Sequence, residues 1–138
     1  MIGVVVVTHS QLGHSLIETA EFILGSRPQN VEPVSINVKK DVDELRIKIA
    51  DAIKKVDSGA GVFILTDMFG GTPSNLSYSF LEDGKIEVIS GVNLPILIRA
   101  INMQDNTDLS KAANSLVSSG KRSISLASGI LKGSKPNE

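Results

Sequence analysis

The sequence predicts a doubly wound α/β domain, in which a mostly parallel sheet carries helices on both faces. Short apolar runs of strand length alternate along the chain with segments of helical periodicity. The strand-like runs cover residues 2–7, 34–38, 61–65 and 86–89, and such continuous runs are typical of strands buried on both faces of a parallel sheet. Alternating strands and helices build right-handed βαβ units. The ligand of such a domain is expected at the carboxyl ends of the strands, where the winding of the sheet reverses.

Segments between these runs have helical patterns with recognisable ends. The first has apolar residues at one-face spacing, namely Leu16, Ile17, Ala20, Ile23 and Leu24. Gly25 follows it, where a helix C-cap is expected. Asp41 is the expected N-cap of the second helix. Thr72 followed by Pro73 predicts an N-cap and first helical residue for the third, and Asn93 begins a fourth, short helix.

The last part of the chain predicts a helix, an edge strand and a tail. Apolar residues recur at helical spacing from Leu109 to Val117, and Gly120 is the expected end of this helix. Residues 123–126 (Ser-Ile-Ser-Leu) alternate polar and apolar side chains, which is typical of an edge strand exposed on one face. We therefore expect one domain at residues 1–128 and a flexible C-terminal tail at residues 129–138.

The amino-acid composition and net charge exclude several classes of function. The chain has 138 residues, of which 41% are hydrophobic and 21% charged, with a formal net charge of −1. This charge, without any block of Lys and Arg, gives no field for a nucleic-acid partner. The absence of cysteine excludes disulfides and thiolate chemistry.

The N-terminus lacks the basic region and long apolar stretch of a secretory signal, and its apolar run is too short to span a membrane. A cytoplasmic location is expected.

Two polar residues at predicted strand ends are the strongest candidates for chemistry. His9 follows the first strand, and Asp67 follows the third. If these strands flank the reversal point, the two side chains can meet. A carboxylate that binds one imidazole nitrogen fixes the tautomer, leaves the other nitrogen free as a nucleophile and stabilises the cation that forms. The pair therefore suits a histidine that carries a phosphoryl group. A histidine after a strand is nevertheless more often structural than catalytic.

The glycine turn after Asp67 adds an anion site to this hypothesis. Gly70 and Gly71 allow close approach of the backbone to a ligand, and the helix start that follows offers free N–H groups, with the Thr72 hydroxyl as a further donor. The arrangement requires no metal and no cofactor. His14 is expected to be a solvated surface residue, and residues 105–108 lack the ligand spacing of a calcium loop.

The whole pattern resembles the enzyme IIA component of the mannose family of the bacterial phosphoenolpyruvate-dependent sugar phosphotransferase system. Four motifs in order carry the resemblance: Thr8-His9 after the first strand, the end of the first helix at Leu24-Gly25, Asp67 with residues 69–73 (Phe-Gly-Gly-Thr-Pro), and residues 90–95 (Ser-Gly-Val-Asn-Leu-Pro). Phe69 stands where this family is associated with a larger aromatic residue, and Thr72 stands where serine is familiar.

The resemblance implies a role and partners. His9 would accept a phosphoryl group from the phosphocarrier protein HPr and pass it to an enzyme IIB partner, with Asp67 orienting the imidazole. The protein would be a phosphotransferase serving carbohydrate uptake or its regulation, in association with a membrane permease complex. The family also implies a homodimer, in which the C-terminal edge strand pairs with the partner's sheet.

Other functions remain open at this point. The phosphocarrier subunit of phosphotransferase-dependent dihydroxyacetone kinase shares the fold and an N-terminal histidine, although residues 69–73 favour the mannose family. A histidine phosphatase or mutase would need clustered arginines and a second histidine near His9. A receiver domain with Asp67 as acceptor would need paired acids after the first strand. An interaction module without chemistry would tolerate mutation of His9.

Overall fold

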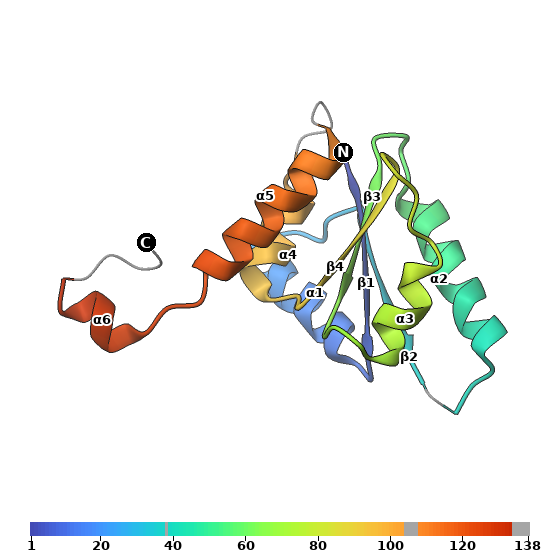
Figure 1. Ribbon diagram of the computed structural model, residues 1–138, viewed down its shortest axis with the longest axis horizontal. Coiled ribbons are helices and arrows are strands. Elements are labelled where there is room, and N and C mark those ends of the chain that lie inside the picture. Colours follow the sequence, from blue (N-terminus) through green and yellow to red (C-terminus); the bar gives the residue numbers. More distant parts are fainter. Residues whose placement is uncertain (38, 104–107, 134–138) are drawn as a thin grey trace.

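The fold is built on a sheet of four parallel strands. The computed structural model describes residues 1–37, 39–103 and 108–133. Its strands are β1 (Gly3–His9), β2 (Val31–Ile36), β3 (Val62–Thr66) and β4 (Ile86–Ser90), in the order β2-β1-β3-β4. The winding therefore reverses between β1 and β3, which are adjacent. This arrangement, shown in Figure 1, confirms the predicted doubly wound α/β class.

Helices cover both faces of the sheet. One face carries α1 (Leu12–Leu24), α4 (Leu94–Ile101) and α5 (Leu109–Arg122), and the other carries α2 (Val42–Val56) and α3 (Thr72–Tyr78) (Figure 1). Alternate residues of β1 point to opposite faces, so Val4 and Val6 join the first core while Val5 and Val7 join the second. Because all four are fully buried, β1 is the centre of the molecule. Among the described residues, no helix has the length and apolar character of a membrane span.

Local sequence signals account for most helix ends. The Asn93 side chain accepts the N–H of Ile96 at 2.9 Å, and the Asp41 side chain accepts the N–H of Asp43 at 3.3 Å, so both predicted N-caps are confirmed. Gly25 ends α1 in the left-handed conformation, with φ of +87°. The third helix begins one residue earlier than predicted: Gly71 is its N-cap, and Thr72 already lies within it.

Two sequence expectations about apolar residues differ from the structure. Strand β2 begins at Val31, whereas the apolar run predicted a strand at residues 34–38, of which Val38 lies outside the described residues. Pro33 obscures this strand in the sequence, but an edge strand tolerates a residue without an N–H. On α1, the sequence places Ile23 and Leu24 on the buried stripe, yet both are exposed because the buried residues of this helix end at Ala20.

The expected C-terminal edge strand is not formed within the single chain. Ser123 is the C-cap of α5, and residues 124–126 lead without regular structure into a short helix, α6 (Ala127–Leu131), which the sequence did not predict. Figure 1 shows this C-terminal arm leaving the body of the molecule on the side of α5. A strand needs hydrogen-bonding partners on a neighbouring strand. The arm points away from the sheet of its own chain, so the alternating pattern alone does not produce a strand.

Candidate functional site

The carboxyl ends of β1 and β3 bring His9 beside Asp67. The register pairs Val7 with Thr66, so both side chains follow the last paired residues of neighbouring strands. The Nδ1 atom of His9 lies 2.7 Å from Oδ2 of Asp67. The same carboxylate oxygen accepts the backbone N–H of His9 at 2.8 Å. Because both bonds come from one residue, they fix the position of the imidazole ring and its rotation together.

The electrostatics of the pair favour one tautomer of His9. Burial acts to raise the pKa of Asp67, but hydrogen bonds from the His9 amide, the His9 ring and the Met68 amide outweigh burial and lower this pKa below its ordinary value. The carboxylate is therefore ionised at neutral pH and can only accept hydrogen bonds. Nδ1 of a neutral His9 must then carry the proton, which leaves the lone pair on Nε2. The His9 side chain is 44% exposed and that of Asp67 only 10%, so the ring alone is open to a partner.

The glycine turn lies against the Nε2 edge of the ring. A Cβ atom added at Gly71 would lie 3.0 Å from Cε1 and 3.5 Å from Nε2 of His9. Gly70, which precedes it, has φ of +84°, in the region that favours glycine. Thr72 is the first residue of α3, and the first N–H groups of a helix have no partner within it. The structure thus brings Gly71 to His9, with Gly70 and Thr72 on either side of it in the chain.

The turn that follows His9 is also constrained. Ser10 has φ of +51°, the one positive φ among the non-glycine residues that the structure describes. The N–H of Gly13 donates to Thr8 Oγ1 at 2.8 Å, and this buried bond ties the start of α1 back to the end of β1. Residues in sparsely populated backbone regions persist where the surrounding structure holds them, and they concentrate at functional sites. The tight turn starts α1 within three residues of His9.

Three hydroxyl residues near the site were missed by sequence reasoning. Thr66 ends β3, Ser90 ends β4, and the register pairs these two residues directly. Ser74 lies in the first turn of α3, and its hydroxyl contacts both of them. The available signal was the hydroxyl residue at the end of two neighbouring strands, β3 and β4. This signal is weak, because serine and threonine are common wherever a strand ends.

The other polar candidates lie apart from this pair. His14 is exposed, and its Nδ1 atom lies 3.2 Å from the hydroxyl of Ser35 on the edge strand β2. Of the expected turn at residues 105–108, only Asp108 is among the described residues, where its side chain caps α5. In the part of the chain that the structure describes, no group of three or more His, Cys, Asp and Glu could hold a metal ion. The hydrogen bonds that His9 and Asp67 make there involve no arginine.

Two apolar residues are displayed next to the site. Met68 is 54% exposed and Phe69 is 79% exposed, directly after Asp67 in the chain. The Phe69 ring lies tilted against the ring of the α3 residue Tyr78, with the ring centroids 6.2 Å apart. The two residues together place an exposed apolar surface beside the pair of His9 and Asp67.

Comparisons with known proteins identify the family of the chain. The family model described as "PTS system fructose IIA component" matches residues 3–117. The chain is 30% identical to the PTS system fructose-specific EIIA component of Bacillus subtilis (strain 168), over 93% of this chain and 88% of that relative. It is 32% identical to the PTS system mannose-specific EIIAB component of Escherichia coli (strain K12), over 76% of this chain but only 32% of that longer protein.

A solved structure has the same fold over nearly the whole chain. The phosphotransferase system component EIIA from Streptococcus agalactiae aligns with a TM-score of 0.80 and 23% identity, covering 93% of this chain and 98% of that chain. The family model, which matches residues 3–117, spans most of the sequence. The resemblance seen in the sequence is thereby confirmed, and this chain belongs to the mannose-family IIA components of the phosphoenolpyruvate-dependent sugar phosphotransferase system (PTS).

Proposed function

We propose that this chain is a cytoplasmic phosphoryl carrier, which accepts a phosphoryl group on His9 and passes it to a partner protein. The observation that carries the proposal is the contact of 2.7 Å between His9 Nδ1 and Asp67 Oδ2 on a ring that is otherwise open to solvent. Membership of a phosphotransferase-system family supports a transfer reaction over an interaction module without chemistry.

In the proposed step, Nε2 of neutral His9 attacks the phosphorus atom of a phosphohistidine on the donor protein. The new N–P bond forms at Nε2 while the donor's N–P bond breaks, and the bonding electron pair leaves with the donor imidazole. His9 keeps its Nδ1 proton, and its ring gains a positive charge next to the ionised Asp67. Passing the group on repeats the same exchange with an acceptor imidazole or thiolate. The protein mainly positions the reacting groups, as is usual for phosphoryl transfer.

We further propose that Gly70, Gly71 and Thr72 receive the phosphoryl oxygens. Gly71 is the residue that faces Nε2, and a side chain there would occupy the space beside that atom. A group on Nε2 would therefore lie over this turn, close to backbone N–H groups and to the Thr72 hydroxyl. Backbone N–H groups bind phosphoryl oxygens without adding a mobile charge.

The proposed partners are HPr as donor and an enzyme IIB as acceptor. Two imidazoles can exchange a phosphoryl group only if the proteins pack closely around both of them. Met68 and Phe69 offer an apolar contact surface at the edge of the site, and their exposure supports docking at this end of the sheet.

We also propose that the chain forms a homodimer through its C-terminal arm. Ile124 and Leu126 are strongly exposed in the single chain, which leaves the apolar half of the alternating segment uncovered. Strand β4 is at the end of the strand order, so one of its edges carries no neighbouring strand among the described residues. A hollow of about 130 Å³ beside it is lined by residues that include Ile89, Ile96 and, from the arm of the same chain, Ile124. Residues 123–126 of a second copy would supply the missing edge strand and cover this hollow.

The carrier role is tested by phosphorylating the purified chain with phosphoenolpyruvate, enzyme I and HPr. We expect an acid-labile gain of about 80 Da by intact-mass spectrometry on the wild type and no gain on His9→Ala. The sequence has only two histidines, so His14→Ala is the matched control and should keep the adduct. An adduct on His9→Ala would move the acceptor elsewhere, and no adduct on the wild type would reject the carrier role.

A further inference from the structure

A cluster of three hydroxyl groups lies beneath the loop that carries Asp67. The Ser74 Oγ atom lies 2.6 Å from Oγ1 of Thr66 and 3.2 Å from Oγ of Ser90, and Thr66 Oγ1 lies 3.0 Å from Ser90 Oγ. Thr66 and Ser74 are fully buried. The cluster therefore joins the ends of β3 and β4 to the first turn of α3, on the inner side of the site.

The direction of these hydrogen bonds shows that Ser74 is a donor to the loop that carries Asp67. Its hydroxyl donates to the backbone carbonyl of Met68 at 2.6 Å. A serine hydroxyl has one proton, so towards Thr66 the Ser74 oxygen can only accept. The hydroxyl of Thr66 is then the donor in that contact, and because it also donates to Ser90 Oγ at 3.0 Å, its one proton is shared between the two serine oxygens. The sheet thereby holds Ser74 in the orientation that points at Met68.

Met68 in turn holds the carboxylate. Its backbone N–H donates to Asp67 Oδ1 at 3.0 Å, while Asp67 Oδ2 accepts both bonds from His9. The Met68 side chain is exposed and Gly70 follows in a left-handed conformation, so side-chain packing does little to fix this residue. The bond from Ser74 to the Met68 carbonyl is thus a main restraint on Met68, the residue whose N–H positions the carboxylate.

We propose that Ser74 is a positioning residue for His9, acting through Met68 and Asp67. The proposal rests on the carrier function proposed above and extends it to a residue that touches neither the imidazole nor the phosphoryl group. Removing the Ser74 hydroxyl should loosen the backbone of Met68 and lengthen the contact between Asp67 and His9. The ring should then also populate the tautomer with its proton on Nε2. That tautomer has no lone pair at the attacking atom.

Ser77 offers a matched control on the same helix. It is also fully buried, and its hydroxyl donates to the Pro73 carbonyl at 2.6 Å within α3. Ser77→Ala therefore removes one buried hydroxyl from α3 and leaves the Met68 carbonyl bonded. A general loosening of α3 would appear in both variants, whereas loss of positioning would appear in Ser74→Ala alone.

The first measurement is the ¹⁵N chemical shift of the two His9 ring nitrogens in unphosphorylated protein, compared with His14 as an internal reference. Wild type and Ser77→Ala should show the proton on Nδ1, and Ser74→Ala should show a mixture of tautomers. Unchanged His9 shifts in Ser74→Ala, or equal changes in both variants, would overturn the proposal. Because this readout needs no phosphoryl donor, it remains informative even if the carrier function fails.

The second measurement is a double-mutant cycle with Asp67→Asn on the rate of phosphorylation. We expect Ser74→Ala to slow transfer by roughly tenfold in the wild-type background, because a small misplacement of a reacting group is costly. In the Asp67→Asn background it should have little further effect, since residues that act in one chain are not additive. Equal losses in both backgrounds would mean that Ser74 does not act through Asp67.

A third variant covers the case in which Ser74→Ala does not fold. Thr66→Val keeps the shape of the buried side chain but removes the proton that the Ser74 oxygen accepts. It should shift the His9 tautomers in the same direction as Ser74→Ala, by a smaller amount. A folded Thr66→Val protein with wild-type His9 shifts would count against the proposal.

Discussion

Oδ2 of Asp67 accepts two hydrogen bonds from one residue, His9, at 2.8 Å from the backbone N–H and at 2.7 Å from the ring Nδ1. A bond to the ring alone would leave the imidazole free to swing with the χ1 angle of His9. The additional bond to the backbone fixes the carboxylate relative to the end of β1. The ring is therefore held in place before any partner binds.

Asp67→Asn should slow phosphoryl transfer while the fold is kept. The amide has the shape of the carboxylate, but it carries no charge and can present its NH₂ group to the ring, which favours the tautomer with the proton on Nε2. By analogy with the carboxylate of a catalytic triad, a loss of about 10²-fold to 10⁴-fold is expected. Rapid-quench phosphorylation measures the rate, and circular dichroism checks the fold. A variant with full speed would remove Asp67 from the mechanism.

Asp67 should also make the stability of the fold depend on pH in the acid range. Its pKa in the folded protein lies below the ordinary value of 3.8, so the carboxylate contributes stability above that value. The contribution is lost as the pH falls from about 3.8 through the folded pKa. Urea unfolding of wild type and Asp67→Asn between about pH 2 and pH 6 should therefore show a smaller acid-range loss in the variant.

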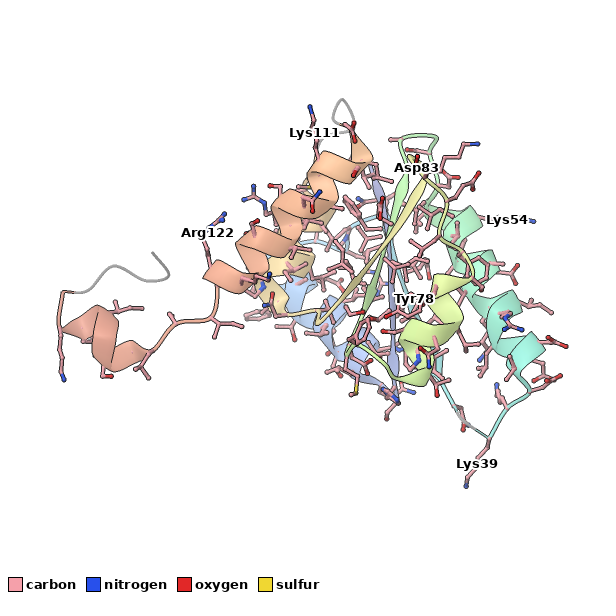
Figure 2. All side chains as sticks on the ribbon, in the orientation of Figure 1. Lys39, Lys54, Tyr78, Asp83, Lys111 and Arg122 are labelled. Atoms are coloured by element: carbon pink, nitrogen blue, oxygen red, sulfur yellow. The ribbon has the colours of Figure 1, made fainter. Side chains whose placement is uncertain are left out.

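Asp83→Asn is a suitable control for the change in net charge. Asp83 is exposed in the turn between α3 and β4, and Figure 2 places it at the end of the molecule opposite to Lys39, which lies at the carboxyl ends of the strands. The control should keep the acid-range loss of the wild type. If it flattens the curve as much as Asp67→Asn does, the effect is one of overall charge and not of the pair with His9.

Gly71→Ala should impair transfer more than stability. The backbone of Gly71 has φ of −86°, which any residue adopts, so the variant carries no backbone strain. The new methyl group would, however, lie 3.0 Å from Cε1 of His9 and beside Nε2. We expect a displaced ring and a transfer rate lower by about tenfold or more, measured as the rate of adduct formation.

Gly84→Ala should show the opposite signature. Gly84 has φ of +75°, and no atom outside its chain neighbours lies within 4 Å of an added Cβ, so the cost is backbone strain of about 1–2 kcal/mol. This turn lies far from His9, next to Asp83, and transfer should be unaffected. Equal transfer rates in Gly71→Ala and wild type would show that the approach to Nε2 is wider than the structure indicates.

Thr8→Val should destabilise the protein although it conserves the shape of the side chain. Thr8 is fully buried, and its hydroxyl accepts the N–H of Gly13, which would have no partner in the variant. An unsatisfied buried donor costs about 1–3 kcal/mol. The free energy of unfolding in urea measures the loss. Thr19→Val, on the exposed surface of α1, is the control and should change it by less than about 0.5 kcal/mol.

Short-range signals made much of the fold predictable from the sequence. The buried runs that became β1 and β3 consist almost entirely of apolar residues, and the caps at Asp41 and Asn93 depend on contacts within a few residues. Strand β2 was placed less well, because its start at Val31 depends on pairing with Val4 across the sheet. Pairing of this kind is a long-range interaction. The local sequence does not predict it, because Pro33 lies inside the strand.

The site was predictable to the extent that strand ends are. Once His9 and Asp67 were placed after the first and third strands, their proximity followed from the order of a doubly wound sheet. Three other features could not be predicted from the sequence. These are the two hydrogen bonds that Asp67 Oδ2 accepts from His9, the contact of Gly71 with the ring, and the hydrogen bond from Ser74 to Met68. Each depends on atomic positions within a few ångströms, which the register of β1 with β3 and the angle of α3 determine.

The sequence by itself determined the α/β class, the order of most elements and the position of His9 and Asp67 at neighbouring strand ends, because hydrophobic period and capping chemistry act locally along the chain. The tertiary structure alone decided which nitrogen of His9 is open, which groups restrain Asp67, and that residues 123–126 leave the body of the chain instead of joining its sheet. Hydrogen-bond direction and strand pairing are properties of groups that meet only after folding. A pattern such as the alternation at residues 123–126 becomes a strand only where another strand lies within reach.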